Sequence, residues 1–522
     1  MKITDIHKIE QATSVSRGEL FRVGTAVLFI VGIMLFIDTG VQVTGSNVLL
    51  VAAAMIGGYM ALNIGANDVA NNVGPAVGSK ALSLVGAIII AAIFESAGAL
   101  LAGGEVVGTI KKGIIDPDLI PNVDTFIWLM MAALLAGAIW LNIATAMGAP
   151  VSTTHSIVGG VLGAGIAAGG MGIANWSKMS AIAASWVISP VLGGIIAAFF
   201  LYLIKRTITY KDDPLQAAKK VVPFLLGFMG WSFSTYIILK GLKKIWKLEF
   251  LPAAGYGFLI ALAIYLIARP LVNRAAKKLE SNKESVNQLF TVPLVFSAAL
   301  LSFAHGANDV ANAVGPLAAI NDAMTGGGIS AKASIPLWVM MVGAIGISLG
   351  LALYGPKLIR TVGTEITELN KIRAFSIAMA ASITVIIASQ MGLPVSSTHI
   401  AVGGIFGVGF LREYLKASYG ETLVEIKHHH DHDNPEEVEK FLNQFKAANL
   451  EKQREMLDQL KAHSTKAQLT KKERRALGRI YKQELVKRSH LLKIAAAWLI
   501  TVPVSGLLAA IIYFTIRGIM LP

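Results

Sequence analysis

Long apolar runs separated by short polar segments dominate this chain of 522 residues. Clear examples lie at residues 48–61, 81–92 and 181–204. A helix needs about 20 predominantly apolar residues to cross the hydrocarbon core of a bilayer. Because such runs recur along the chain, the pattern predicts several membrane-spanning helices and an all-α polytopic membrane protein. The run at 23–37 follows a polar N-terminus without a small-residue cleavage site, so we expect an uncleaved span there.

Composition agrees with a membrane protein and excludes cysteine chemistry. Only 15% of the residues are charged, 54% are hydrophobic, and the mean hydropathy is +0.62. Soluble proteins are usually about 25% charged. The chain has no cysteine, which excludes disulfides, thiolate metal sites and cysteine nucleophiles. The net charge of +14 is better explained by basic cytoplasmic loops than by nucleic-acid binding.

Two motifs occur twice, in the same order. GANDVANNVGP at 65–75 returns as GANDVANAVGP at 306–316, with ten of eleven positions identical. MGAPVSTTH at 147–155 returns as MGLPVSSTH at 391–399 after nearly the same separation. Two collinear pairs at one separation indicate an internal duplication.

The duplication predicts a six-part organisation. The parts are a cytoplasmic N-terminus with an extra span (1–46), a first repeat (47–204), a linker with two spans (205–289), a second repeat (290–411), a small helical cytoplasmic insertion (412–489) and the final span of the second repeat (490–522). Basic residues in the N-terminus and near 205–220 and 269–289 follow the positive-inside rule if all three lie in the cytoplasm. The lysines between 240 and 247 then lie outside, against this rule. On this count the repeats are inverted in the membrane, as in many secondary transporters.

The first motif places an acid at the end of an apolar run in each half, at Asp68 and Asp309. An acid at membrane depth is costly and indicates a functional site. Amide oxygens accompany each acid, at Asn67, Asn71, Asn308 and Asn312. Oxygen ligands suit a hard cation such as sodium, and the Gly-Pro pairs at 74–75 and 315–316 predict helix breaks that free carbonyls for the same ion. Helix capping without a ligand is the alternative, which two matched copies disfavour.

The second motif places hydroxyls after a proline, Pro150 or Pro394, that interrupts an apolar stretch. The short apolar flanks, 125–147 and 151–168 in the first half, predict a re-entrant helical hairpin with its tip at membrane depth. Free N–H groups and hydroxyls at a helix start form an anion site. The hydroxyls expected to bind the anion are those of Ser152, Thr153, Thr154, Ser396, Ser397 and Thr398. The alternative is a pair of proline-kinked spans whose hydroxyls bond the freed carbonyls.

Three further ionisable residues are possible auxiliaries. His155 and His399 directly follow the hydroxyl motifs and either bond substrate, relay protons or simply pack. Glu95 lies inside an apolar run and serves cation or proton coupling, or is a neutral buried acid. The four motifs contain no Lys or Arg, so an anion beside two carboxylates would be repelled unless cations bind with it. This composition predicts cation-coupled anion symport.

The paired motifs resemble those of the PiT family of inorganic phosphate transporters, over most of 52–409 and the final span. The segments 107–109 and 360–363 resemble the weaker intermediate signature of that family. The resemblance implies phosphate uptake with sodium or protons through the inner or plasma membrane, by alternating access around a midplane site between two hairpin tips. It also implies an inverted-repeat fold, often a homodimer, coupling ions on the Asn-Asp motifs and phosphate on the six hydroxyls. It implies nothing about the insertion, whose His cluster at 428–432 is either a solvated linker or a zinc or nickel site.

Other functions compete with this interpretation. An intramembrane metal-dependent enzyme or a metal-ion transporter would use His155, His399, Asp68 and Asp309. The chain has no His-Glu-x-x-His motif and no evident nucleophile–base pair, so we expect no enzyme, no catalytic residue, no resident metal and no cofactor beyond coupling ions. A channel would not need the duplicated acid and anion motifs. Sodium and protons both fit the cation, and phosphate, arsenate and sulfate all fit the anion.

Overall fold

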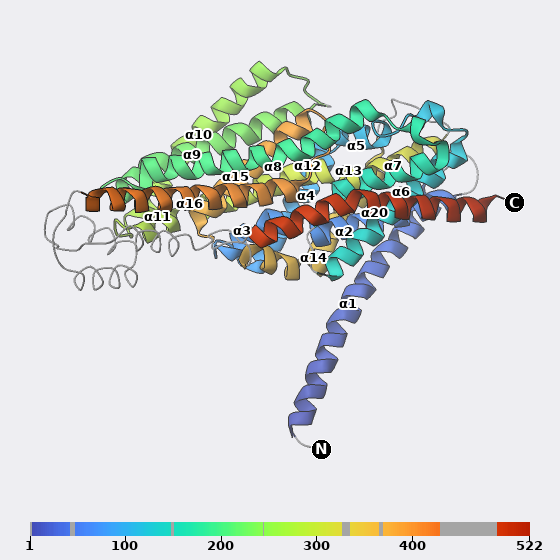
Figure 1. Cartoon of the computed structure of the whole chain (residues 1–522), viewed down its shortest axis with the longest axis horizontal. Coiled ribbons are helices and arrows are strands. Elements are labelled where there is room, and N and C mark those ends of the chain that lie inside the picture. The colour runs from blue at the N-terminus through green and yellow to red at the C-terminus, as the bar shows by residue number, and fades with distance from the viewer. Residues whose placement is uncertain are drawn as a thin grey trace. The chain divides into compact units, whose positions relative to one another are not determined.

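The computed structural model describes residues 3–41, 47–147, 151–243, 245–325, 335–364, 369–428 and 488–521. Every named element within these ranges is a helix, and eleven helices are long and apolar enough to cross a membrane. The first of these candidate spans, Gly18–Gly40, contains the expected span at 23–37. The all-α polytopic architecture is therefore confirmed (Figure 1).

The N-terminal part of the chain forms the helices α1 (Ile3–Gly40), α2 (Val48–Asn67), α3 (Ala70–Gly78), α4 (Leu84–Ala102), α5 (Gly104–Lys112), η1 (Pro117–Leu119), α6 (Val123–Ala146), α7 (Thr153–Gly169), η2 (Met171–Ile173) and α8 (Trp176–Ile204). The linker contains η3 (Lys205–Thr209), α9 (Pro214–Tyr236), η4 (Ile237–Gly241) and α10 (Phe250–Ala276). The rest of the described chain forms α11 (Lys283–Leu289), α12 (Thr291–Asp309), α13 (Ala311–Met324), α14 (Leu337–Thr364), α15 (Lys371–Gln390), α16 (Ser397–His428) and α20 (Arg488–Met520). The matched helices α6 and α15 both start after a capping asparagine, Asn122 or Asn370.

The helix breaks near the Asn-Asp motifs lie earlier than the Gly-Pro pairs, so that part of the prediction was wrong. One break separates α2 from α3 at residues 68–69, and the other separates α12 from α13 at Val310. Pro75 and Pro316 lie inside the following helices. A helix tolerates such a proline because only the carbonyl four residues earlier loses its N–H partner. Those carbonyls belong to Asn71 and Asn312, so each proline still frees one backbone carbonyl within its own Asn-Asp motif.

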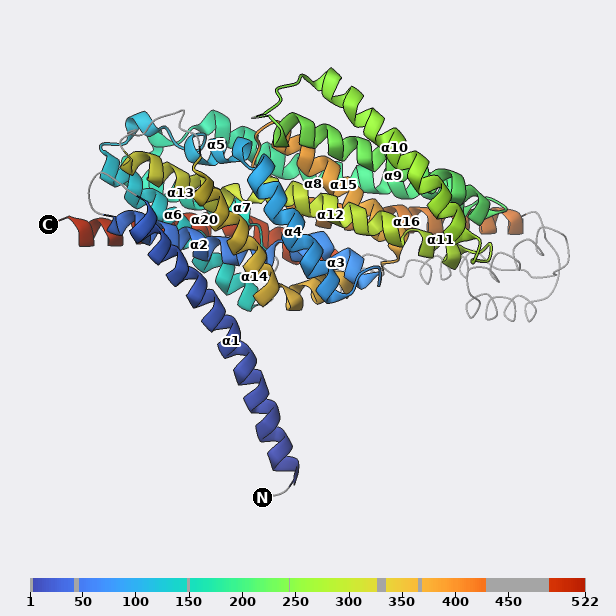
Figure 2. The ribbon, with the colours of Figure 1, turned by 180° about the vertical axis from the view of Figure 1, so that it is seen from behind.

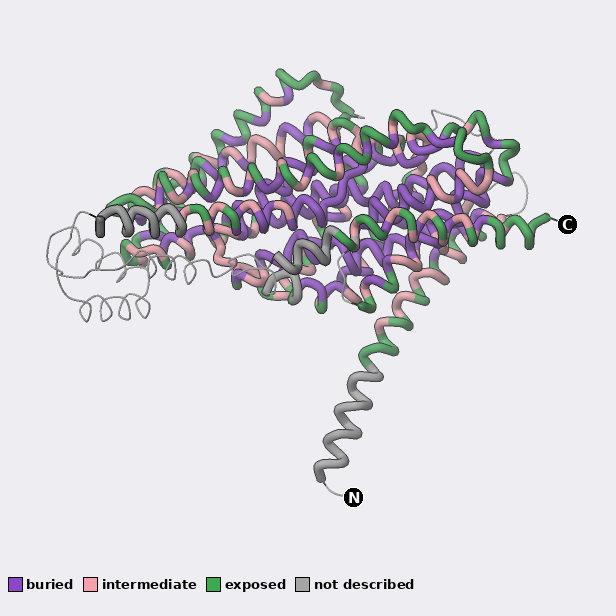
Figure 3. The backbone as a smooth tube through the Cα atoms, in the orientation of Figure 1, coloured by how far each residue is buried: buried purple, intermediate pink, exposed green. Residues whose placement is uncertain are grey.

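Burial distinguishes central helices from peripheral ones (Figure 3). Most residues of α6, α12, α13 and α15 are buried, whereas the spans in α1 and α10 are mostly exposed. Large exposed apolar side chains, such as Leu28 and Phe258, are expected where a helix faces lipid. The reverse view shows that α4 lies beside α12 and α14 (Figure 2).

Glycines allow equivalent helix pairs to meet at their backbones. Gly65 of α2 lies against the carbonyl of Ile347 in α14, and Gly306 of α12 lies against the carbonyl of Glu95 in α4. Gly163 of α7 lies against Gly506 of α20 in the same way. Small residues are favoured where helices approach this closely, because a side chain would hold the two backbones apart.

Two of the lysines between 240 and 247 have an acidic partner. Lys240 and Lys243 both contact a carboxylate oxygen of Glu105, at 3.1 and 2.6 Å. Partial burial would raise the pKa of Glu105, but hydrogen bonds from Lys243 and Lys240 outweigh it and hold this pKa below its usual value. Glu105 therefore offsets part of the positive charge that the positive-inside rule disfavours at this end of α9.

The chain divides into two compact units, one formed by 1–407 with 489–522 and the other by 408–488. The helix α16 continues to His428, and residues 429–487 lie outside the described residues. The predictions of a helical insertion and of its His cluster fall largely on this range and stay predictions.

Candidate functional site

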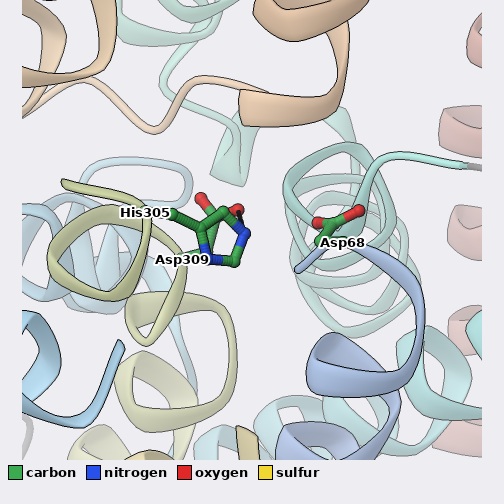
Figure 4. A group of neighbouring side chains, drawn as sticks. All are labelled: Asp68, His305 and Asp309. Carbon is green, nitrogen blue, oxygen red and sulfur yellow. Dashed lines mark ion pairs between the residues drawn. The ribbon is translucent and has the colours of Figure 1, made fainter. Parts of the chain in front are cut away.

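Asp68 and Asp309 lie at the two helix breaks and are both buried. They come from separate helices, with Asp309 next to His305 on α12 and Asp68 at the end of α2 (Figure 4). The flanking amides of Asn67, Asn71, Asn308 and Asn312 are buried as well. The structure thus places the acids of both repeats, with their asparagines, inside one protein core.

The hydroxyl motifs start the helices α7 and α16, as the sequence predicts. Ser152 accepts a hydrogen bond from the backbone N–H of His155 at 3.1 Å, and Ser396 accepts the matching bond from His399 at 3.2 Å. Thr154 donates to the carbonyl of Val395 at 3.0 Å, so the two motifs meet directly. Pro150 lies outside the described residues.

Hydroxyls from both repeats bond the two acids. Asp68 accepts hydrogen bonds from Thr153 at 2.5 Å and from Thr398 at 2.8 Å, one on each carboxylate oxygen. Asp309 accepts one from Ser397 at 2.9 Å. Since Thr398 belongs to the second repeat and Asp68 to the first, the four sequence motifs converge on one buried cluster.

The two asparagines of each motif form different hydrogen bonds in this cluster. Asn67 donates to Thr145 at 2.9 Å and accepts from the N–H of Val151, which ties α2 to both sides of the first hydroxyl motif. In the second repeat Asn308 donates to Ser389, the counterpart of Thr145, and its amide nitrogen also donates to the carbonyl of Leu393. The second asparagine of each motif instead donates to hydroxyls of the other repeat: Asn71 to Thr398, and Asn312 to Thr153 and Thr154.

Three buried oxygens of the second Asn-Asp motif accept no hydrogen bond within the described chain. They are Oδ1 of Asn308, Oδ1 of Asp309 and Oδ1 of Asn312. A buried acceptor without a donor costs about 1–3 kcal/mol, and more when it is charged. A set made only of amide and carboxylate oxygens fits a hard cation.

A row of buried polar side chains, not predicted from the sequence, leads from Asn72 through Glu95 and His305 to Asp309. Glu95 accepts a hydrogen bond from Asn72 at 2.7 Å and lies 2.7 Å from Nδ1 of His305. The other ring nitrogen, Nε2, lies 2.8 Å from Oδ2 of Asp309. Glu95 therefore has a partner, His305, in the second repeat. A signal existed: His305 precedes Gly306 where Ile64 precedes Gly65, a polar residue in place of an apolar one.

His155 and His399 lie side by side where the two repeats meet. Their ring centroids are 4.4 Å apart, in an edge-on arrangement. His155 packs on Trp186 with centroids 3.8 Å apart, and His399 stacks on Trp498 at 3.5 Å. The indole of Trp186 also donates to the carbonyl of Pro394 at 3.1 Å, so it bridges the repeats. Both imidazole rings are thus packed among aromatic side chains, and the roles of the two histidines stay predictions.

The intermediate segment at 107–109 contacts the second hydroxyl motif. Thr109 on α5 donates to the carbonyl of Gly392 at 2.6 Å. Gly392 has a positive φ of 65°, which glycine adopts with little strain. This contact ties α5 to the turn that leads into α16. Of the matching segment at 360–363, only the side chain of Arg360 is among those described.

Comparisons with known proteins agree with this geometry. A model of the Phosphate transporter family matches residues 64–509. A protein of Helicobacter pylori named "Putative phosphate permease" is 52% identical over 523 residues, covering 98% of both chains. A phosphate permease of Pyrococcus abyssi, named in the same way, is 39% identical over 363 residues, covering 70% of this chain and 89% of the relative.

A solved structure, described as the sodium-dependent phosphate transporter, has the same architecture. It superimposes with a TM-score of 0.74 at 30% identity, covering 91% of this chain and 100% of the other. The family match spans most of the chain and includes all four motifs. The eleven candidate spans place the protein in a membrane, and the family carries out transport rather than catalysis. This chain belongs to the Phosphate transporter family: it is a multi-pass membrane transporter of phosphate and not an enzyme.

Proposed function

We propose that this chain imports inorganic phosphate by symport with sodium or protons, using alternating access around a site between the two hydroxyl motifs. The supporting observation is that both acids accept hydrogen bonds from these motifs within one buried cluster. Hydroxyls at two helix starts suit an anion. The oxygens of Asn308, Asp309 and Asn312 that accept no hydrogen bond from the described residues suit a cation. The similarity to a sodium-dependent phosphate transporter favours sodium.

The proposed architecture has two inverted repeats, 47–204 and 290–411, the second completed by 490–522. Each repeat contributes one re-entrant hairpin, formed by α6 with α7 and by α15 with α16. The matched breaks and the matched glycine contacts of α2 with α14 and of α12 with α4 support the duplication. We also propose a homodimer in the inner or plasma membrane, with 1–46, 205–289 and 412–489 as additions to the two repeats.

Uptake of labelled phosphate into proteoliposomes tests the function. An inward sodium gradient should drive uptake above the level without a gradient, and an imposed pH gradient tests protons in its place. Asp68→Asn and Asp309→Asn should each abolish the driven component, because each removes a carboxylate from the proposed ion site. Normal cation-driven uptake by either variant would reject the ion assignment. Competition by unlabelled arsenate and sulfate measures the anion selectivity.

A second candidate cargo is a divalent metal ion. Among the described residues, ligand atoms of Asp68, His305 and Asp309 lie within 4.8 Å of one another, a group that could hold such an ion. Neither His155 nor His399 belongs to it, which corrects the residue set expected for this alternative. His305 already contacts Glu95 and Asp309, so a metal would have to break these contacts. Phosphate-independent uptake of labelled manganese or zinc would support this cargo, and we expect none.

A further inference from the structure

The hydroxyls of the two threonines that bond Asp68 each donate one hydrogen bond and accept another. Thr153 donates to Oδ2 of Asp68 and accepts from Asn312 at 3.1 Å. Thr398 donates to Oδ1 of Asp68 and accepts from Asn71 at 2.8 Å. A hydroxyl carries one hydrogen, so neither can donate to a second acceptor at the same time.

Phosphate needs the two hydroxyl hydrogens that Thr153 and Thr398 donate to Asp68. Its oxygens are mainly acceptors, and Thr153 and Thr398 are two of the six hydroxyls proposed to bind it. While Asp68 accepts both hydrogens, these hydroxyls present only oxygen lone pairs to an anion. Asp68 and phosphate therefore compete for the same two donors.

A cation at Asp68 resolves this competition. It can be bound by the carboxylate and by the lone pairs of the same hydroxyls, since all of these are hard oxygen ligands. The hydroxyl hydrogens then point away from the cation and towards the phosphate. Cation and phosphate would thus each favour binding of the other, by the same factor.

The other half of the site lacks this arrangement. Asp309 is bonded by Ser397 and contacted by His305 on one oxygen, Oδ2, while Oδ1 is unpaired within the described residues. Thr154, the counterpart of Thr398, donates to the carbonyl of Val395 instead of to an acid. The chain therefore contains two equivalent threonines of which only one bonds a carboxylate.

We propose that Thr153 and Thr398 form a hydroxyl latch on Asp68, which sodium must release before phosphate can use both hydroxyls. The proposal rests on the proposed phosphate symport and deepens it, because it assigns the coupling of the two ligands to named hydrogen bonds. It predicts that removing a latch hydroxyl reduces the coupling itself. Simple charge neutralisation of the two acids by sodium predicts a coupling that does not depend on these hydroxyls.

The test measures equilibrium binding of labelled phosphate to the purified full-length protein, without sodium and with saturating sodium. The ratio of the two dissociation constants is the coupling factor. Thr398→Val keeps the side-chain shape but removes the hydroxyl, so it should weaken binding by about tenfold in sodium and hardly at all without it. The coupling factor should fall by about the same tenfold. Thr398→Ser restores the hydroxyl and should restore the factor.

Thr154→Val is the matched control. Its hydroxyl bonds a backbone carbonyl, so its loss should change phosphate affinity alike in both conditions and leave the ratio unaltered. Thr153→Val provides a second latch variant if Thr398→Val does not yield folded protein. A wild-type coupling factor in the latch variants, an equal fall in Thr154→Val, or no effect of sodium on the wild type would overturn the latch. Absence of phosphate binding to the wild type in any condition would instead reject the proposed function.

Discussion

At the scale of single residues, the surroundings of Asp68 and Asp309 are unequal, because His305 and Glu95 lie on the side of Asp309. The backbone contacts of Gly65 and Gly306 identify Ile347 as the counterpart of Glu95, and the repeat identifies Ile64 as the counterpart of His305. The side of Asp309 therefore has an acid and an imidazole at the positions where the side of Asp68 has two isoleucines. His305 contacts Asp309 on Oδ2, the oxygen that also accepts from Ser397, and Oδ1 accepts no hydrogen bond from the part of the chain that the structure describes.

This inequality predicts the stability of variants. Glu95→Ile or His305→Ile alone breaks the buried Glu95–His305 pair and leaves its other ionisable member in the core, which costs about 3–5 kcal/mol. The double variant removes both members and copies the apolar residues of the other half, so it should be more stable than either single variant. Thermal unfolding of purified protein in detergent measures this order. Ile347→Leu, a volume-conserving change, is the control and should differ little from wild type. A double variant that unfolds at or below the single variants would contradict the prediction.

At the scale of elements, close backbone contact joins helices from different repeats. Gly163 of α7 abuts Gly506 of α20, and Gly407 of α16 abuts Gly194 of α8. A helix that starts at one hydroxyl motif thus packs on the last helix of the other repeat. Small residues are favoured at such contacts because side chains would hold the backbones apart.

Gly163→Ala tests this packing with the smallest possible change. A Cβ at position 163 would clash with backbone atoms of Gly506, so α7 and α20 would have to separate. Overpacking typically costs about 1–3 kcal/mol, which should lower the unfolding temperature and the amount of protein in the membrane. Gly172→Ala is the control, since a Cβ there meets no atom within 4 Å. Equal stability of the two variants would show that the contact of α7 with α20 is loose.

At the scale of the whole molecule, the site lies within the unit formed by 1–407 and 489–522. The other unit, 408–488, contributes none of the residues described in the site. The Helicobacter relative aligns with 98% of this chain and the Pyrococcus relative with 70%. We therefore propose that the first unit carries the transport site.

Replacing residues 429–487 by a flexible glycine-serine linker tests this assignment. Phosphate uptake per inserted protein should match that of the whole chain, because the replaced residues supply no group of the proposed site. Uptake into proteoliposomes is the measurement, and the full-length chain prepared in parallel is the control. Loss of uptake in a variant that still inserts and unfolds cooperatively would place part of the transport step in the insertion.

The sequence alone determined the spans, the duplication, the four motifs and the family resemblance. These follow from local features, since apolar run length and a repeated motif are visible without knowing what touches what. The convergence of the motifs was expected from their chemistry. The positions of the helix breaks were not, because a proline in a helix removes one hydrogen bond without ending the helix.

Only the tertiary structure decided which hydroxyl serves which acid. Thr154 and Thr398 occupy equivalent places in nearly identical motifs, yet one bonds a backbone carbonyl and the other bonds Asp68. The partner of Glu95 was equally hidden, because Glu95 and His305 are 210 positions apart in the chain. Such pairings depend on how α4 packs against α12 and on how the two repeats face one another. A pattern within one stretch of sequence carries no record of that packing, so the distinct environments of Asp68 and Asp309 appear only in the folded chain.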